Sequence, residues 1–456
     1  MSRKSSRTRK KTESLTVIRP HAAGIDLGAT QHFVCCPVTP TATEIRSFGT
    51  DTPSLVELTD WLAENGVDSV AMESTSVYWI PLYEMLADRG FAVSLANARS
   101  VASLPGRKSD VADCQWLQQL HSYGLVKGSF RPSEAIVRFR ALARMKLVLV
   151  EDRADWIRRM QKEMDQMNVR VHRAVSDVTG RTGMAMMRAI VDGERDPERL
   201  AELRDARCRK SHEEMVDELT GTWREEHLLN LGISLRMFDD ISARIEDIEQ
   251  AITDLAESHT LPDAPSVPPH PDPRKAARMR KTGQEAKREL LFRMSGFDLT
   301  TIETICAETA ETLISELGTD FDPFPDLKHF LAYLRLAPNL AVSGGKPLHK
   351  KKPGIGVQRA RTALILAAST IRNSKTGLGA YYRSIAYRKG NGVAAFATAR
   401  KVATYVFNLV KFGAEYVAEE LRVYDERHRG KRIARLKTNA SDLGFQIVPL
   451  PPTATA

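Results

Sequence analysis

The chain has 456 residues, enough for two or three ordinary domains, and a hydrophobic share of 42%, which is sufficient for well-formed cores. Its formal net charge of +9 favours a polyanionic partner such as nucleic acid. The sequence contains no apolar run of membrane-spanning length, no secretory signal, no basic amphipathic membrane helix and no CxxC pair among its five scattered cysteines. We therefore expect a cytoplasmic protein with reduced thiols and no membrane association.

Residues 1–16 form a basic arm rich in Ser and Thr, which we expect to lack regular structure on its own. The next segment, 17–128, predicts an α/β domain. Strand-like runs occur at HAAGIDL, HFVCCPV and TEIRSFG, and two further strands at VDSVAME and FAVSLAN alternate with helices. Three strands before such an alternation predict a mixed sheet with helices on its faces.

Four carboxylates of this segment occupy positions where α/β sheets place their sites. Asp26 and Glu73 each end a predicted strand, and Asp110 and Asp113 share one face at the start of a predicted helix. Converging carboxylates repel one another unless cations neutralise them or their pKa values rise. Mg²⁺ accepts hard oxygen ligands, and paired ions stabilise both oxygens of a phosphoryl transfer. The structural alternatives are a turn residue, the start of a loop and a helix cap.

We expect residues 129–258 to be helical and elongated, with two apolar seams at the spacings of a heptad repeat. A helical hairpin within the chain and a coiled coil between subunits would both bury these seams. The first seam contains Leu142, Met145, Leu149, Trp156, Met160, Met164, Met167 and Val171, and the second Phe238, Ile241, Ile245, Ile248, Ile252 and Leu255. The Pro-rich run TLPDAPSVPPHPDPRK then predicts an extended linker over 259–284.

The segment 285–420 contains a long stretch in which all charged side chains other than histidine are basic. No Asp or Glu occurs over 327–414, although acids make up about an eighth of the chain, and sixteen Lys and Arg fall in this window. A solvated surface normally mixes both signs, so the window predicts contact with a phosphate backbone. The expected backbone-binding residues are Lys346, Lys350, Lys351, Lys352, Arg359 and Arg361. A basic tail, 421–456, follows.

Ser343 lies within this window, directly before a Gly-Gly pair. A serine hydroxyl is a weak nucleophile at neutral pH and needs a base, a metal or strong electrostatic help. No acid is near it in sequence, so the activator we expect is the remote carboxylate site with its Mg²⁺, supplied by folding or by a neighbouring subunit. Attack on a phosphodiester would leave a covalent phosphoserine link. The structural alternative for Ser343 is a plain turn residue.

A strand-end Asp, a strand-end Glu and a helical D-x-x-D, in that order, form the layout of an RNase H-like nuclease core. GIDLG with Asp26, MESTSVYW with Glu73, and KSDVADCQWL with Asp110 and Asp113 resemble the four-carboxylate, RuvC-like domain of the insertion-sequence "one-ten" group of transposases. This resemblance implies an α/β plus α fold class: an RNase H/RuvC-like mixed sheet with flanking helices, a long helical coiled-coil region and a mainly helical C-terminal transposase domain.

LAPNLAVSGGK, with Ser343, resembles the serine signature of the C-terminal transposase domain in the same group. The runs TALILAASTIRN, YYRSIAYRKG and ATARKVATYVFNLV follow the group's pattern downstream. RELLFRMSGFDLTTIETICAETAETLISEL resembles the preceding helix–turn–helix, with Met-Ser-Gly-Phe-Asp where members often have a Pro-Gly hairpin.

The resemblance implies a DNA recombinase that moves an insertion element between donor and target DNA, with the four carboxylates and Ser343 as its catalytic residues. Similar recombinases are guided by a structured non-coding RNA, so the resemblance also implies an RNA partner. Because strand exchange holds two duplexes at once, we expect a homodimer or homotetramer. Two other interpretations stay open: a metal-dependent nuclease or junction resolvase in which water attacks, and a non-catalytic nucleic-acid-binding remnant.

Overall fold

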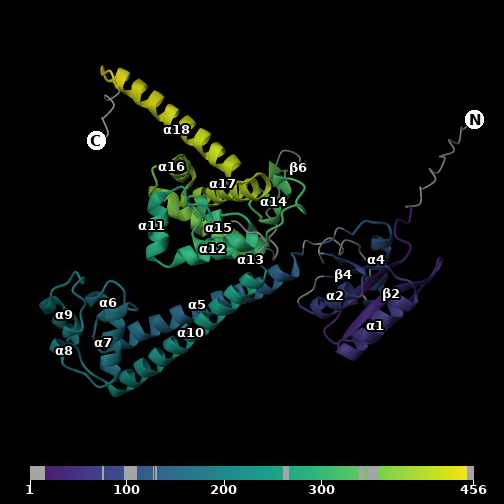
Figure 1. The fold of residues 1–456 in the computed structure, drawn as a ribbon, viewed down its shortest axis with the longest axis horizontal. Coiled ribbons are helices and arrows are strands. Elements are labelled where there is room, and N and C mark those ends of the chain that lie inside the picture. The colour runs from purple at the N-terminus through teal and green to yellow at the C-terminus, as the bar shows by residue number, and fades with distance from the viewer. Residues whose placement is uncertain are drawn as a thin grey trace, which may run out of the picture. The chain divides into compact units, whose positions relative to one another are not determined.

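The structure is a computed structural model that describes residues 16–73, 77–96, 110–126, 128, 131–259, 266–337, 342–343, 346–347 and 358–448. The chain divides into two compact units, residues 1–131 and 132–456, and each is described by itself (Figure 1). Within the described residues, none of the helices combines the length and the hydropathy that a membrane span requires.

The first unit is built on a five-stranded mixed sheet with the strand order β3-β2-β1-β4-β5. Figure 1 shows β2 and β4 of this sheet with α1, α2 and α4 in the same unit. β1 (Ala22–Leu27), β2 (Gln31–Thr39) and β3 (Ala42–Gly49) form an antiparallel meander. β4 (Ser69–Glu73) pairs in parallel with β1, and β5 (Ala92–Ala96) in parallel with β4. This arrangement confirms the predicted mixed sheet.

Three helices pack against this sheet: α1 (Thr52–Glu64), α2 (Trp79–Asp88) and α4 (Asp110–Ser122). The Asp51 side chain caps α1 by accepting a hydrogen bond from the Ser54 amide at 3.0 Å. Leucines of α1 and α2 share one core with Ile25 and Met72, whereas Leu117 of α4 packs with Ala71 and Ala96 in a separate cluster. Neighbouring strand residues point to opposite faces, so α4 covers the face opposite to the one that α1 and α2 cover.

The second unit begins with a hairpin of two long helices, α5 (Glu134–Gln166) and α10 (Glu225–Ser258), which lie side by side (Figure 1). Four short helices pack at one end of it: α6 (Val171–Ala174), α7 (Arg181–Val191), α8 (Pro197–Glu202) and α9 (His212–Leu219). The pairing within the chain corresponds to the hairpin alternative, and a heptad coiled coil is not confirmed.

The two predicted seams differ in how well they match the hairpin. The second seam is largely buried, with Ile241, Ile245, Ile252 and Leu255 all at most 8% exposed. The first seam is wrong at Met145, which is 53% exposed, whereas the next residue, Lys146, is buried. Lys146 faces inward because its ammonium group contacts the Glu311 carboxylate at 2.9 Å and the Glu249 carboxylate at 3.0 Å.

The remainder of the second unit is mainly helical, as expected. Its elements are α11 (Pro273–Lys281), α12 (Gln284–Ser295), η1 (Leu299–Thr301), α13 (Ala307–Leu317), α14 (Leu327–Tyr333), β6 (Val342–Ser343), β7 (Lys346–Pro347), α15 (Gln358–Thr370), η2 (Ile371–Asn373), α16 (Gly377–Lys389), α17 (Asn391–Phe412) and α18 (Ala414–Asp442). Phe321, Phe330 and Phe407 stack with centroids 4.9–6.2 Å apart and join α14 to α17.

Two stretches differ from the expected linker and tail. Residues 273–281 of the expected linker form α11, because Asp272 accepts the amides of Arg274 and Lys275 and Pro273 suits the first helical turn. Residues 421–442 of the expected tail belong to α18, in which Arg422 pairs with Glu419 and Glu426 one turn away on either side.

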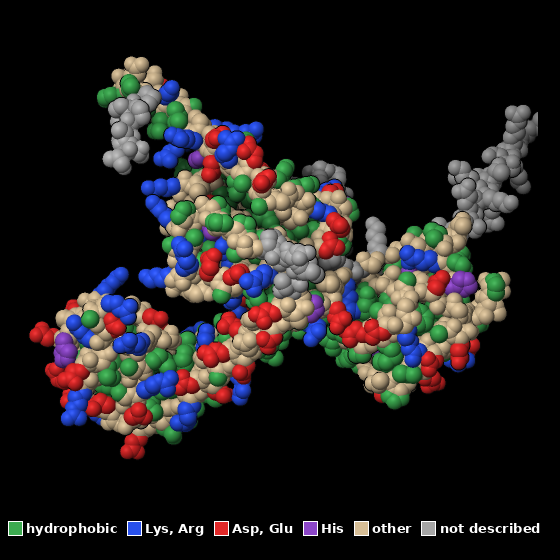
Figure 2. All heavy atoms as spheres, in the orientation of Figure 1, with side chains coloured by type: hydrophobic (Ala, Val, Ile, Leu, Met, Phe, Trp, Pro, Cys, Tyr) green, Lys and Arg blue, Asp and Glu red, His purple; other side chains and the backbone are tan. Residues whose placement is uncertain are grey.

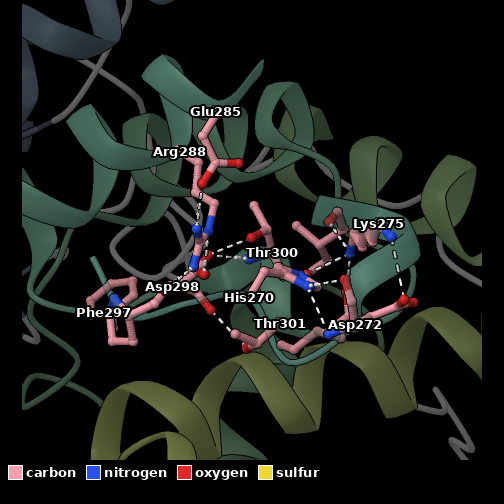
Figure 3. Close-up of polar contacts among 12 residues, drawn as sticks. His270, Asp272, Lys275, Glu285, Arg288, Phe297, Asp298, Thr300 and Thr301 are labelled. Atoms are coloured by element: carbon pink, nitrogen blue, oxygen red, sulfur yellow. Dashed lines mark hydrogen bonds and ion pairs between the residues drawn. The ribbon is translucent and has the colours of Figure 1, made fainter. Parts of the chain in front are cut away.

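A buried polar network holds the segment before α11 against the turn between α12 and α13 (Figure 3). The Arg288 guanidinium donates to Asp298 at 2.7 Å and to the Pro268 carbonyl at 2.6 Å. The Lys275 ammonium donates to the carbonyls of Thr300 and Ile302 at 2.5 and 3.0 Å, and burial lowers the pKa of Lys275 to about 8. These contacts fix the start of the C-terminal helices.

Candidate active site

The parallel pairing of β1 and β4 brings two of the predicted carboxylates together. Ile25 of β1 is in register with Met72 of β4, so the next residues, Asp26 and Glu73, lie side by side at the carboxyl ends of their strands. Side chains alternate along each strand, and both carboxylates point to the face that α4 covers. This edge is where open α/β sheets place their sites.

Helix α4 supplies the other two carboxylates, and a glycine lets it approach. A Cβ atom at Gly24 would lie 2.2 Å from the Gln118 backbone nitrogen, so only glycine allows this contact between β1 and α4. Gln118 also donates to the Ala22 carbonyl at 3.1 Å. The first turn of α4, with Asp110 and Asp113, therefore extends towards Asp26, farther along β1.

The electrostatics of Asp26 indicate that the other three carboxylates lie near enough to influence its charge. Burial raises the pKa of Asp26, and the negative charges of Asp110, Asp113 and Glu73 raise it further, to about 6. A hydrogen bond from the backbone at Leu27 partly opposes this rise. A carboxylate with a raised pKa next to like charges is typical of a functional site.

The four carboxylates offer only oxygen donors, the type that a hard divalent cation prefers. Among the described residues, no group of three or more His, Cys, Asp or Glu side chains lies close enough to hold a metal ion as the side chains stand. However, the charges of Glu73, Asp110 and Asp113 all act on Asp26, and burial keeps the nearby Cys114 in its thiol form by raising its pKa to about 12. A cation among these oxygens would offset the repulsion that raises the pKa of Asp26, and oxygen-only donors suit Mg²⁺.

The raised pKa of Asp26 predicts a pH-dependent stability in protein stripped of metal. A carboxyl whose folded pKa lies near 6 rather than 3.8 retains its proton longer in the folded state, so its ionisation lowers the free energy of unfolding as pH rises from about 4 to 6. Added MgCl₂ should offset this loss. Asp26→Asn should remove much of the pH dependence and of the Mg²⁺ effect. Denaturation midpoints measured from pH 4 to 8, with EDTA or MgCl₂, report the pH dependence and the Mg²⁺ effect. Equal stabilisation of wild type and Asp26→Asn by Mg²⁺ would refute the assignment of Asp26 to a metal site.

The serine signature belongs to the second unit. β6 and β7 pair antiparallel, with Ser343 opposite Lys346, and the structure describes the backbone of these two residues. Lys350, Lys351 and Lys352 lie outside the described residues.

The last two of the expected backbone-binding residues lie on α15. Arg359 is exposed, and the Arg361 guanidinium lies 5.4 Å from the centre of the Phe396 ring. Arg359 is thus available to a ligand, whereas Arg361 also packs against α17.

Sequence analysis missed the role of Gly24. The available signal was a glycine inside a predicted strand, which often marks a close approach of another backbone.

Two known protein families match this chain, one over the segment with the four carboxylates and one over the segment with Ser343. A model for the DEDD transposase of IS110 matches residues 23–169, a range that contains all four carboxylates. A second model, the transposase of the IS116/IS110/IS902 family, matches residues 298–383, a range that contains Ser343. A search among curated proteins gave no match. Because the two matches cover about half of the chain and the first coincides with a mixed sheet that carries Asp26 and Glu73 on adjacent strands, the chain belongs to the IS110 family of transposases.

Proposed function

We propose that this transposase cleaves and exchanges DNA strands at a site formed by Asp26, Glu73, Asp110 and Asp113, with Ser343 as nucleophile. The observation that carries the proposal is the register of β1 with β4, which places Asp26 beside Glu73 at the strand ends next to the first turn of α4. The pKa of Asp26, raised by burial and by the three other carboxylates, agrees with this placement. A site of this composition would hold Mg²⁺, which when bound withdraws electron density from the phosphate and stabilises the oxygens of the displacement.

The proposed reaction conserves the phosphodiester energy. The Ser343 oxygen forms a bond to phosphorus while the bond from phosphorus to one strand oxygen breaks. The serine proton is balanced by the proton that the departing strand oxygen takes up. A hydroxyl end of another strand then attacks the phosphoserine, which joins the new strands and regenerates the serine hydroxyl.

The charge distribution supports the backbone contacts of this proposal. The window 327–414 has no acid, and the exposed Arg359 belongs to it. We propose that Lys346, Lys350, Lys351, Lys352, Arg359 and Arg361 contact phosphates of donor and target DNA. We extend the proposal to a guide RNA and to a homodimer or homotetramer, as the family resemblance implies; the net charge of +9 supports a nucleic-acid partner.

Replacing Lys350, Lys351 and Lys352 together by Gln should weaken DNA binding for all sequences alike. Three lost phosphate contacts should flatten the plot of log affinity against log salt by roughly 3 units of slope. The matched control replaces the same residues by Arg, which keeps the charge and should keep the slope. Anisotropy titrations at several salt concentrations measure this, and a sequence-selective loss would contradict backbone contact.

Chemistry at the proposed site is tested by incubating the chain with Mg²⁺ and labelled DNA that carries an element end. Cleavage with a detergent-resistant protein–DNA adduct supports the serine mechanism. Cleavage without an adduct indicates attack by water, and binding without cleavage indicates a non-catalytic protein.

A further inference from the structure

A basic groove of about 1070 Å³ lies in the second unit between α16 and the C-terminal half of α18. Its cationic lining comprises Arg372, Lys375, Arg383, Lys431, Arg432 and Arg435. Figure 2 shows Lys and Arg side chains gathered on this side of the unit, around α16 and α18. Among the residues that the structure describes, no Asp or Glu belongs to the lining; one carboxylate, Glu303, accepts a hydrogen bond from the lining residue Ser374.

Specific contacts hold the two walls of the groove. The Asp425 carboxylate of α18 accepts the Gly377 amide of α16 at 2.8 Å, and a Cβ atom at Gly377 would lie 2.5 Å from that carboxylate. The Lys401 ammonium lies 3.1 Å from the centre of the Tyr424 ring and joins α17 to α18. Arg383 donates to the carbonyls of Arg372 and Ser374 at 2.9 and 2.6 Å. The groove is therefore a formed feature of the fold.

Charge is segregated along α18. Its acids fall mainly in the first half, where Glu419 and Glu426 pair with Arg422 and Glu420 accepts a hydrogen bond from Asn408. From 427 to 441 the helix has six Lys and Arg and no acid. Within the described part of the chain, no carboxylate lies in ion-pair distance of the three α18 cations that line the groove. Such a row of unneutralised charge favours a polyanionic ligand.

An exposed aromatic ring shares the α16 face of the groove. Tyr387 is 94% exposed. It follows Arg383 by four residues and Ser384 by three, so it lies on the same face of the helix as these two lining residues. Tyr387 is not itself one of the lining residues, but it lies one helical turn along α16 from two of them. An exposed ring next to a basic groove is a surface on which unpaired bases stack. Bases in a duplex already stack on one another, so this feature favours a single strand.

We propose that this groove binds a single-stranded segment of nucleic acid, with its phosphates on Lys431, Arg432 and Arg435 and an unpaired base on Tyr387. The inference rests on one part of the proposed function, namely that the chain binds nucleic acid. It adds a binding site outside the carboxylate cluster and outside residues 346–361. Single-stranded DNA and single-stranded RNA both present this chemistry.

The test uses the full chain with Asp26→Asn, which suppresses cleavage, and labelled oligonucleotides of about 12 nucleotides. The probes are single-stranded DNA, single-stranded RNA and duplex DNA, measured by anisotropy. The groove variant is Lys431→Gln, Arg432→Gln and Arg435→Gln. The matched control removes three charges from the same helix outside the groove: Arg427→Gln, Arg429→Gln and Lys437→Gln. All six side chains are exposed, so neither variant should unfold the protein.

The groove variant should bind single strands about tenfold or more weakly and lower the salt slope by about 2, as for three lost phosphate contacts. The matched control should change affinity less than threefold. Tyr387→Ala should weaken single-strand binding at least about fivefold, with Tyr387→Phe near wild type and duplex binding unchanged. Whichever of the single-stranded DNA and RNA probes loses more affinity in the groove variant identifies the nucleic acid that the groove binds.

Equal losses in the groove variant and its matched control would overturn the groove, because they would indicate a diffuse positive field. Equal losses for duplex and single strands, or no effect of Tyr387→Ala, would overturn the single-strand assignment. Failure of the proposed function is a separate result. It would appear as a wild-type chain that binds single strands through the groove but does not cleave DNA with Mg²⁺.

Discussion

Asp26→Asn should lower Mg²⁺-dependent DNA cleavage at least about 100-fold and leave DNA affinity within about threefold of wild type. The amide removes a negative oxygen from the centre of the four-carboxylate cluster, where Glu73, Asp110 and Asp113 raise the pKa of the carboxyl. The cations that we propose to bind phosphate lie elsewhere in the chain, so the substitution should affect cleavage and not binding. Initial cleavage rates and anisotropy titrations on the same DNA measure the two effects.

The matched control for this substitution is Glu44→Gln. Glu44 lies on β3 of the same sheet, and its contact is an exposed ion pair with Arg46, which contributes little to stability. The control should cleave at the wild-type rate. If Asp26→Asn cleaved DNA at the wild-type rate, the proposed metal site would be wrong. An equal loss of cleavage in Asp26→Asn and Glu44→Gln would indicate damage to the sheet.

Mixing Asp26→Asn with Ser343→Ala should restore part of the cleavage that each variant lacks alone. The carboxylates and Ser343 are over two hundred residues apart and belong to different compact units. In an oligomer, the serine of one subunit can complete the carboxylate site of another, and a mixed oligomer then contains a site with two wild-type halves. The measurement is the cleavage rate against mixing ratio.

The control mixes wild type with a double variant that carries both substitutions, which reports dilution of active sites alone. Absence of any recovery, in samples in which mixed oligomers are demonstrated, would show that each subunit uses its own serine and carboxylates.

The position of each of the four carboxylates on its strand or helix could be predicted from sequence because each follows a local signal. Asp26 and Glu73 end buried apolar runs, and Asp110 and Asp113 begin a helix, so periodicity and strand order were sufficient. What brought the helix onto the sheet was Gly24, because its missing side chain leaves room for the Gln118 backbone. That contact depends on strand pairing, which a single sequence specifies weakly.

The long helices show where apolar periodicity fails. Counting apolar residues placed Met145 in the buried seam, yet the inward position belongs to Lys146, whose charge is neutralised by Glu249 and Glu311. Glu311 lies far along the chain on α13, so its pairing with Lys146 depends on tertiary contacts that no local pattern reveals. Periodicity also could not distinguish a hairpin within the chain from a pairing between subunits.

The predicted linker illustrates a competition between local signals. Proline content favoured an extended chain over 259–284, but Asp272 followed by Pro273 is also a helix-start signal. The helix formed because its Met279 is buried and its Lys275 donates hydrogen bonds to carbonyls of the turn after α12.

Mass spectrometry of the protein–DNA adduct tests the central claim most directly. Wild-type protein is incubated with Mg²⁺ and DNA that carries an element end, denatured in detergent, digested and searched for a nucleotide-bearing peptide. We predict one modified residue, Ser343, and no adduct with Asp26→Asn or Ser343→Ala. Cleavage by wild-type protein without an adduct, or an adduct that persists in Ser343→Ala, would contradict the account.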